Sequence, residues 1–182
     1  MPRYVALLRG VNVGTGKRVP MATFRTVVEA VGGRDVRTLL NSGNAVFTHA
    51  ARRAETLARD IRAGLETSAA VSVAVIVVSS SVLDEVVRDN VFAPDCDAPS
   101  RLLVAFAQEP TAVRELAPLA DLAAPPERFH LGARAAYLWC PAGFMASRAA
   151  VALLGKAGHA VTTRNWATVL KLQALAAGSS RQ

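Results

Sequence analysis

Apolar residues in the first 79 positions alternate between short continuous runs and helical spacing. The runs predict buried strands, and repeats of three and four residues predict amphipathic helices. The predicted elements are a strand at Tyr4–Leu8, a helix from Pro20 to Val31, strands at Val36–Leu40 and Ala45–His49, a helix over Ala54–Leu65 and a strand over Val71–Val77. The order β-α-β-β-α-β is that of the split βαβ unit of the ferredoxin-like fold.

The second half repeats this order after a helix over Val82–Val87, for which Ser81 is the predicted cap, and a Pro/Asp-rich linker at Asn90–Ser100. The predicted elements are a strand at Leu102–Ala107, a helix over Thr111–Leu119 interrupted by Pro118, hairpin strands at Glu127–Leu131 and Ala136–Cys140, a helix over Met145–Leu154, a strand at His159–Thr162 and a last helix over Trp166–Ala177.

These elements predict an α+β protein with two tandem ferredoxin-like (βαββαβ) subdomains, antiparallel sheets and a C-terminal helix. We expect the first subdomain at residues 1–79, a helix and linker at 80–100, and the second subdomain with the C-terminal helix at 101–182. The repeated order suggests an internal duplication.

Composition excludes several protein classes. The chain has 182 residues, 52% of them hydrophobic and 19% charged, which is not the composition of a disordered protein. Two cysteines, Cys96 and Cys140, are too few for a disulfide framework. The longest uncharged run, Thr67–Leu83, is shorter than the ~20 apolar residues that a membrane span needs. We therefore expect a soluble, cytoplasmic protein that does not contact a membrane.

The formal net charge of +7 is unevenly distributed. Residues 1–79 carry 11 basic and 5 acidic side chains, whereas residues 80–182 carry 10 and 9. Arginine outnumbers lysine 18 to 3, a bias that GC-rich codon usage also produces. The basic first half favours an anionic partner.

The predicted topology brings two polar segments to the same end of the first sheet. In a βαββαβ sheet the first two strands are parallel, so the loop after strand one and the hairpin between strands two and three are neighbours. The candidate ligand-binding residues there are Arg9, Gly10, Asn12, Gly14 and Lys17 from the loop, and Ser42, Gly43 and Asn44 from the hairpin.

Cations, amides and accessible backbone N–H groups suit the binding of phosphate or carboxylate. We expect no carboxylate at this end of the sheet, and no histidine, so it does not suit general acid–base catalysis. The loop matches neither the P-loop, since Arg18 follows Gly16-Lys17, nor the dinucleotide fingerprint, since Val19 stands where its third glycine should be. The competing interpretation is a flexible, solvated loop.

A second polar cluster comprises Thr163, Arg164, Asn165 and Trp166. Thr163 or Asn165 can cap the last helix. Arg164 is unfavourable at a helix start because of the helix dipole, so we expect it to pair with a carboxylate, stack on Trp166 or bind an anion. The alternative is a helix cap beside a buried tryptophan.

No other residues suggest a reactive centre. The three histidines, His49, His130 and His159, lack the spacing of metal ligands, so we expect no metal site and no cofactor. Cys140 lies in an apolar strand, which is typical of a core residue. Ser42 has no evident base to make it a nucleophile.

Three motifs resemble those of one bacterial family. The motif residues are Tyr4–Gly14 with Lys17–Met21, Val36–Thr38 with Asn41–Phe47, and Thr162–Leu172. In this order, and spread over essentially the whole chain, they resemble the family catalogued as domain of unknown function 1697. The resemblance implies an α+β protein with two ferredoxin-like subdomains and implies no reaction. Because the motifs are polar loop residues, it adds weight to a binding site.

Three functional hypotheses stay open. The first is a site for a phosphorylated small molecule or nucleotide at the basic loop, with the Thr163–Trp166 cluster as a further part. The second is a single-stranded nucleic-acid-binding module, in which Tyr4 and Phe47 would stack on bases. The third is a non-catalytic interaction protein. The residues leave open whether the chain is an enzyme, which ligand it takes and what its oligomeric state is.

Overall fold

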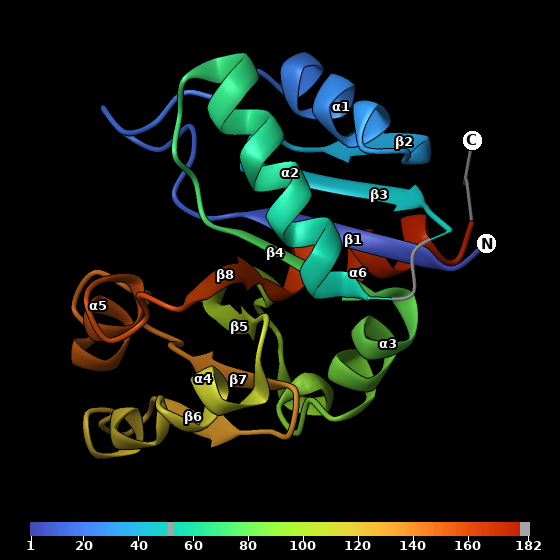
Figure 1. The fold of residues 1–182 in the computed structure, drawn as a ribbon. Coiled ribbons are helices and arrows are strands. Elements are labelled where there is room, and N and C mark those ends of the chain that lie inside the picture. The colour runs from blue at the N-terminus through green and yellow to red at the C-terminus, as the bar shows by residue number, and fades with distance from the viewer. Residues whose placement is uncertain (51–52, 179–182) are drawn as a thin grey trace. The chain divides into compact units, whose positions relative to one another are not determined.

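The structure is a computed structural model that describes residues 1–50 and 53–178. The chain divides into two compact units, one made of Met1–Leu83 with Leu172–Gln182 and the other of Asp84–Lys171. The described residues form a mixed α/β protein with two four-stranded antiparallel sheets and six α-helices, shown in Figure 1. No helix in this part of the chain is both long and apolar enough to cross a membrane.

The first unit contains the sheet order β2-β3-β1-β4, in which every neighbouring pair is antiparallel. Its elements are β1 (Arg3–Leu8), α1 (Met21–Ala30), β2 (Arg34–Leu39), β3 (Asn44–Thr48), α2 (Ala54–Ala69) and β4 (Val75–Ser79), followed by the start of α3 (Ser80–Arg88). β1 is hydrogen-bonded on both edges, and Tyr4–Leu8 are all buried, as their continuous apolar run predicts.

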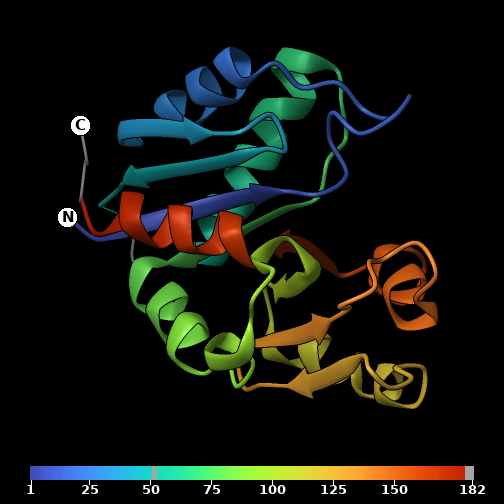
Figure 2. The ribbon, with the colours of Figure 1, turned by 180° about the vertical axis from the view of Figure 1, so that it is seen from behind.

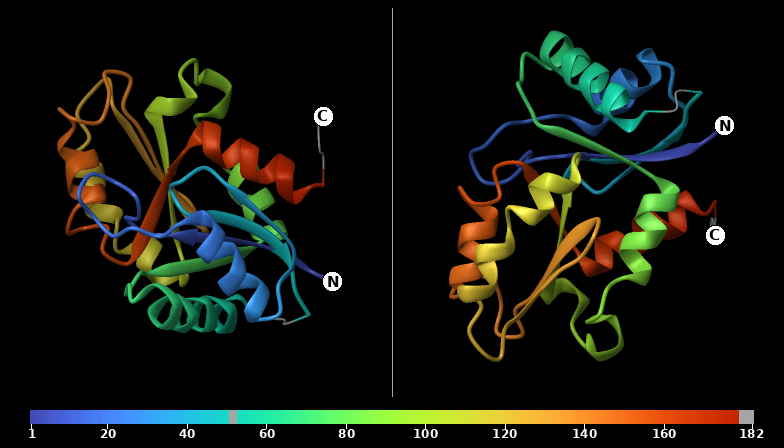
Figure 3. Two further views of the ribbon diagram at one scale, coloured as in Figure 1. Left: turned by 90° about the horizontal axis from the view of Figure 1, so that it is seen from above. Right: turned by 60° about the horizontal axis from the view of Figure 1, so that its bottom comes forward.

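Helices α1 and α2 cover one face of this sheet (Figure 3, right). Alternate β1 residues, Tyr4, Ala6 and Leu8, point into the core beneath them. The helices contribute apolar residues at three- and four-residue spacing, among them Phe24, Val27, Val28, Leu57, Ile61 and Leu65. This core confirms the apolar pattern expected for both helices.

The end of helix α6 (Trp166–Ala176) also belongs to the first unit. The Arg3 guanidinium donates a hydrogen bond to the carbonyl oxygen of Ala176, and the end of α6 lies beside the start of β1 in Figure 2. The predicted division at 1–79, 80–100 and 101–182 placed this whole helix with the second subdomain. The difference arises because a contact between residues 173 positions apart leaves no local signal.

The second unit has the corresponding sheet order, β6-β7-β5-β8, again antiparallel throughout. Its elements are β5 (Leu102–Ala107), α4 (Pro110–Arg114), β6 (Arg128–Leu131), β7 (Ala135–Trp139), α5 (Arg148–Leu154) and β8 (Val161–Asn165). The core on one face contains Leu103 and Ala105 from β5, Leu138 from β7, and Val113 and Leu153 from the helices.

Two predicted strands are shifted, and their partners explain why. The last pair of the β1–β4 ladder joins Leu8 to Val75, where β1 ends, so Val71 and Val73 lie beyond the ladder although these valines alternate. Similarly, β8 extends over Val161–Asn165 rather than His159–Thr162 because those residues pair with β5. Strand length is therefore set by the neighbouring strand rather than by hydrophobic alternation.

Prolines and caps account for the differences in the helices. α4 ends at Arg114, and a separate 3-10 turn, Ala117–Asp121, contains the Pro118 that was expected to interrupt it. α5 begins at Arg148 rather than Met145 because the Ser147 hydroxyl accepts a hydrogen bond from the Ala150 N–H. The predicted linker at Asn90–Ser100 also contains a 3-10 turn, Ala93–Asp95.

The cap of α3 is Ser79, so the prediction of Ser81 is wrong. The N–H of Val82 donates to Ser79 Oγ at 3.2 Å, whereas the Ser81 hydroxyl lies 2.8 Å from the Ser79 hydroxyl.

We expect Ser79→Ala to lower the free energy of unfolding by about 1 kcal/mol, because it removes the cap. Ser81→Ala is the matched control and should cost less in the same urea titration. An equal loss in both variants would contradict the assignment.

A close approach at Gly43 holds the β2–β3 hairpin against β1. Gly43 has φ +82°, and a Cβ built there would lie 2.6 Å from Leu8 Cβ and 2.9 Å from a methyl group of Val11. Both the backbone conformation and the lack of space require glycine at this position.

We therefore expect Gly43→Ala to destabilise the protein by roughly 2–4 kcal/mol through steric overlap and backbone strain. Gly14→Ala is a matched control, because Gly14 has φ +53° but open space around its Cβ position. That variant should cost only about 1–2 kcal/mol. Equal midpoints of chemical unfolding for the two variants would show that the packing at Gly43 is unimportant.

Candidate functional site

The glycine-rich loop (residues 9–18) and the β2–β3 hairpin lie together at one end of the first sheet. The Leu8 N–H donates to the Gly43 carbonyl at 2.8 Å, and Asn12 Nδ2 donates to the Asn41 carbonyl at 2.7 Å. The structure thus brings together two predicted segments about 30 residues apart in sequence. Their role in binding a ligand stays a prediction.

Asn12 is the brace of this loop. Its Oδ1 accepts from the Val19 N–H at 3.0 Å, and its Nδ2 donates to the Val19 carbonyl at 2.8 Å and to Asn41. Both amide hydrogens are therefore used, in a residue with φ +56°, where asparagine is among the best tolerated side chains. Asn12 fixes the shape of the loop, and its amide hydrogens are not available to orient a ligand.

Asn44 and Gly43 also serve the architecture. Asn44 is fully buried, and its Nδ2 donates to the Leu39 carbonyl at 2.8 Å and to Ser42 Oγ at 3.0 Å. Gly43 is buried against β1. Of the three hairpin candidates, only Ser42 is partly exposed, and its hydroxyl also takes part in this network.

The cations of the loop are more accessible. Lys17 Nζ donates to the Ser72 carbonyl, and Arg18 Nη2 donates to the Gly14 carbonyl at 2.8 Å; both residues are exposed. Neither forms an ion pair with any described carboxylate. Arg9 is half-buried, and Gly10 and Gly14 adopt positive φ angles beside open space. The loop therefore presents positive charge from a defined backbone.

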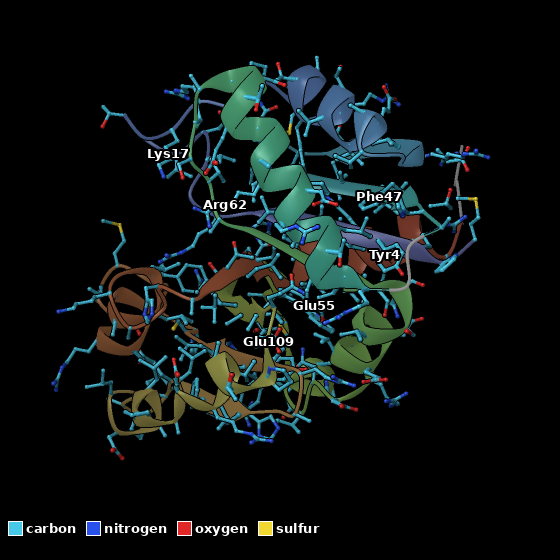
Figure 4. All side chains as sticks on the ribbon, viewed as in Figure 1. Tyr4, Lys17, Phe47, Glu55, Arg62 and Glu109 are labelled. Atoms are coloured by element: carbon cyan, nitrogen blue, oxygen red, sulfur yellow. The ribbon has the colours of Figure 1, made fainter. Side chains whose placement is uncertain are left out.

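A carboxylate lies closer to these cations than the sequence predicts. Ser72, which accepts from Lys17, donates through its own hydroxyl to Glu66 Oε1 at 2.9 Å (Figure 4 shows Lys17 beside the chain leading into β4). Hydrogen bonds from Ser72 and Arg62 lower the pKa of the Glu66 carboxyl, which favours its charged form. The expectation of a carboxylate-free end is wrong, because the turn after α2 returns Ser72 to the loop.

The second cluster has a different structure from the one predicted. Thr163 and Arg164 belong to strand β8, not to a helix start. Asn165 is the cap of α6, since its Oδ1 accepts from the Thr168 N–H at 2.9 Å; this confirms one of the two expected caps. Trp166, the first residue of the helix, is 5% exposed.

Arg164 is a buried cation. It is 7% exposed, and burial lowers its pKa to about 10, so it remains protonated at neutral pH. Its Nη1 donates to Thr162 Oγ1 at 3.0 Å and to the Thr163 carbonyl at 2.7 Å. This burial argues against an open anion site at Arg164. Because the two clusters lie in different units, their use in a common site stays a prediction.

The remaining candidates are core residues. Tyr4 and Phe47, proposed to stack on bases, are 3% and 1% exposed in the core under α1 and α2. Burial raises the pKa of the Cys140 thiol, which disfavours its nucleophilic form. Among the residues described, no group of three or more His, Cys, Asp or Glu side chains could hold a metal ion.

The fold and the loop together define a mixed α/β protein with two four-stranded antiparallel sheets and an exposed basic loop. The family described as "protein of unknown function (DUF1697)" matches residues 1–137, and the chain belongs to this family. A conserved bacterial protein, SP0830 from Streptococcus pneumoniae, has a similar solved structure, with a TM-score of 0.78 and 22% identity over 97% of this chain and 99% of that one. A comparison with curated proteins gave no match.

The brace at Asn12 is testable with Asn12→Gly, which removes the side chain while keeping the backbone angle accessible. Loss of three hydrogen bonds from a partly exposed residue should lower the free energy of unfolding by about 1–3 kcal/mol. It should also speed hydrogen exchange at the Val19 amide, which donates to Asn12. The measurement is hydrogen exchange followed by NMR. An exchange rate of the Val19 amide equal to that in the unmodified protein would contradict this role of Asn12.

Proposed function

We propose that the glycine-rich loop of the first unit binds an anionic small molecule, such as a phosphorylated metabolite or a nucleotide. The observation that carries the proposal is the exposure of Lys17 and Arg18 without a carboxylate partner among the described residues, on a loop braced by Asn12.

Donor capacity supports this proposal. Lys17 and Arg18 each give one hydrogen bond to a backbone carbonyl, while an ammonium has three N–H donors and a guanidinium has five. The remaining donors can reach the oxygens of a phosphate, and a bidentate arginine contact gives such binding geometric specificity. By contrast, the seven ion pairs found in the described residues use other arginines.

The chemistry of the loop supports binding rather than a particular reaction. A general acid or base near neutral pH needs a histidine or a carboxyl group with a raised pKa. Glu66, the carboxyl group linked to Lys17 through Ser72, has a lowered pKa instead. We therefore propose a ligand and propose no reaction.

We also infer that both units are ferredoxin-like and arose by internal duplication. Their corresponding strand orders, β2-β3-β1-β4 and β6-β7-β5-β8, support this inference.

We also propose a cytoplasmic location. Its support is that Cys96 and Cys140 are both free thiols.

The loop proposal predicts thermal stabilisation by anions. Inorganic phosphate, a sugar phosphate and a nucleoside triphosphate should each be added to the purified protein while its unfolding is monitored. A ligand present at 100 times its Kd should add about 2.7 kcal/mol of stability. Lys17→Ala/Arg18→Ala should abolish the effect.

A charge-matched control separates site binding from general attraction to a basic protein. Arg114→Ala/Arg148→Ala removes the same charge from two exposed arginines of the second unit and should keep the full stabilisation. An equal loss of anion-induced stabilisation in the two double variants would reject the loop as the site.

The nucleic-acid alternative is tested by adding single-stranded RNA to the same protein. Binding that weakens steeply with salt would support that alternative.

A further inference from the structure

The sheet of the second unit has a polar and aromatic face opposite its α4/α5 core. On β6, Phe129 and Leu131 pack toward the core, so the intervening Arg128 and His130 point to the other side. The register pairs Arg128 with Trp139 and His130 with Tyr137. Cross-strand pairing therefore gathers these four side chains on one face.

A segment of residues 90–101, here called the strap, contacts this face through Phe92. The Phe92 ring is 6% exposed, and its centroid lies 6.3 Å from the rings of both His130 and Trp139. The His130 and Tyr137 rings stack at 5.9 Å. The result is a continuous aromatic cluster built from two strands and the strap.

Arg128 lies over this cluster. Its guanidinium carbon is 4.9 Å from the centroid of Phe92 and 4.6 Å from that of Trp139, which are cation–π distances. The side chain is nevertheless 47% exposed, and its ion pair with Asp95 is a single N–O contact of 3.4 Å. Two rings thus orient a guanidinium whose other donors remain accessible.

Two buried donors beside Phe92 have no acceptor among the described residues. They are Asn90 Nδ2 and Trp139 Nε1, in side chains of residues that are 4% and 8% exposed. Asn90 Oδ1 accepts from the Phe92 N–H at 3.0 Å, which fixes the orientation of the carboxamide within the strap. The neighbouring Tyr137 hydroxyl, by contrast, donates to the Val86 carbonyl at 2.7 Å. Because buried polar groups are normally paired, these two donors are candidates for binding an acceptor from outside the chain.

We propose that Asn90, Arg128 and Trp139 form a second binding site, for a small organic carboxylate with an aromatic or other apolar body. Asn90 Nδ2, the Arg128 guanidinium and Trp139 Nε1 are all donors, so their complement is an acceptor-only group such as a carboxylate. A nucleobase edge fits less well, because it also presents donors. The surrounding rings of Phe92, His130 and Trp139 provide an apolar surface for the body of the ligand.

Asp95 acts as the internal competitor for this site. Its carboxylate occupies Arg128 through one long contact and is 64% exposed. A ligand carboxylate that pairs with the guanidinium through two shorter hydrogen bonds displaces it. Substitution of Asp95 therefore tightens binding rather than weakening it, an outcome that separates this mechanism from simple surface attraction.

The experiment uses NMR of the indole N–H groups of the full chain. The protein has only two tryptophans, Trp139 and Trp166, so two indole signals are expected and Trp139→Phe assigns them. Sodium benzoate is the probe, with acetate to test the need for an apolar body and inorganic phosphate to test for general anion binding. We expect benzoate to shift the Trp139 signal saturably and more strongly than either, with the Trp166 signal as an internal reference.

Variants identify the binding groups. Arg128→Ala should weaken benzoate binding at least tenfold, and Asp95→Asn should tighten it several-fold. Arg134→Ala is the matched control, because Arg134 is an exposed arginine on the same hairpin that pairs with Glu85 at 3.1 Å. It should leave benzoate binding unchanged.

Three results would overturn the proposal. One is a Trp139 indole signal that does not shift when benzoate is added, while its N–H proton exchanges with water protons. That result is expected if a buried water accepts the hydrogen bond from Trp139 Nε1. Another is an equal response in Arg128→Ala and in the unmodified protein. The third is an unchanged affinity for benzoate in Asp95→Asn. Because the Asp95 side chain is exposed, this substitution leaves the core intact. This site shares no residue with the glycine-rich loop. The test of phosphate binding at the loop and the test of benzoate binding at Arg128 are therefore independent, and either proposal can be rejected without the other.

Discussion

Each half of this protein depends on a central strand that is hydrogen-bonded on both edges. β1 and β5 are almost wholly buried, and their side chains alternate between two faces. In the first unit this alternation sends Tyr4 and Ala6 under the helices and brings Leu8 against Gly43 at the end of the strand. The place where the central strand ends thus decides where the polar loop begins and which hairpin it meets.

Several polar residues that attract attention in the sequence hold the backbone rather than face a ligand. Asn12 closes the glycine-rich loop, and Asn44 closes the hairpin, each with its amide hydrogens used internally. Such residues are as distinctive of a family as binding residues, because a left-handed backbone angle or a buried carbonyl restricts the choice of side chain. The exposed cations carry the functional argument because no described carboxylate is paired with them.

Buried polar groups within the second unit differ in how they are hydrogen-bonded. Arg164 is buried, yet it donates to the Thr162 hydroxyl and the Thr163 carbonyl in its own strand. Asn90 and Trp139 are equally buried and keep a donor without an acceptor among the described residues. A satisfied buried cation is consistent with a structural role, whereas the two unsatisfied donors support the proposal of a second binding site. Burial and hydrogen bonding, rather than residue type, separate these roles.

The sequence by itself determined the order of strands and helices, including its recurrence in the second half, and the meeting of loop and hairpin. These follow from local periodicity, turn residues and the few topologies that a βαββαβ order allows. Only the tertiary structure decided the ends of β4 and β8, the approach of Ser72 and Glu66 to Lys17, and the aromatic cluster around Arg128. Each depends on a partner far along the chain, and such contacts leave no periodic signal near either residue. Local pattern therefore predicted the elements, while long-range packing decided which polar groups remain available for chemistry.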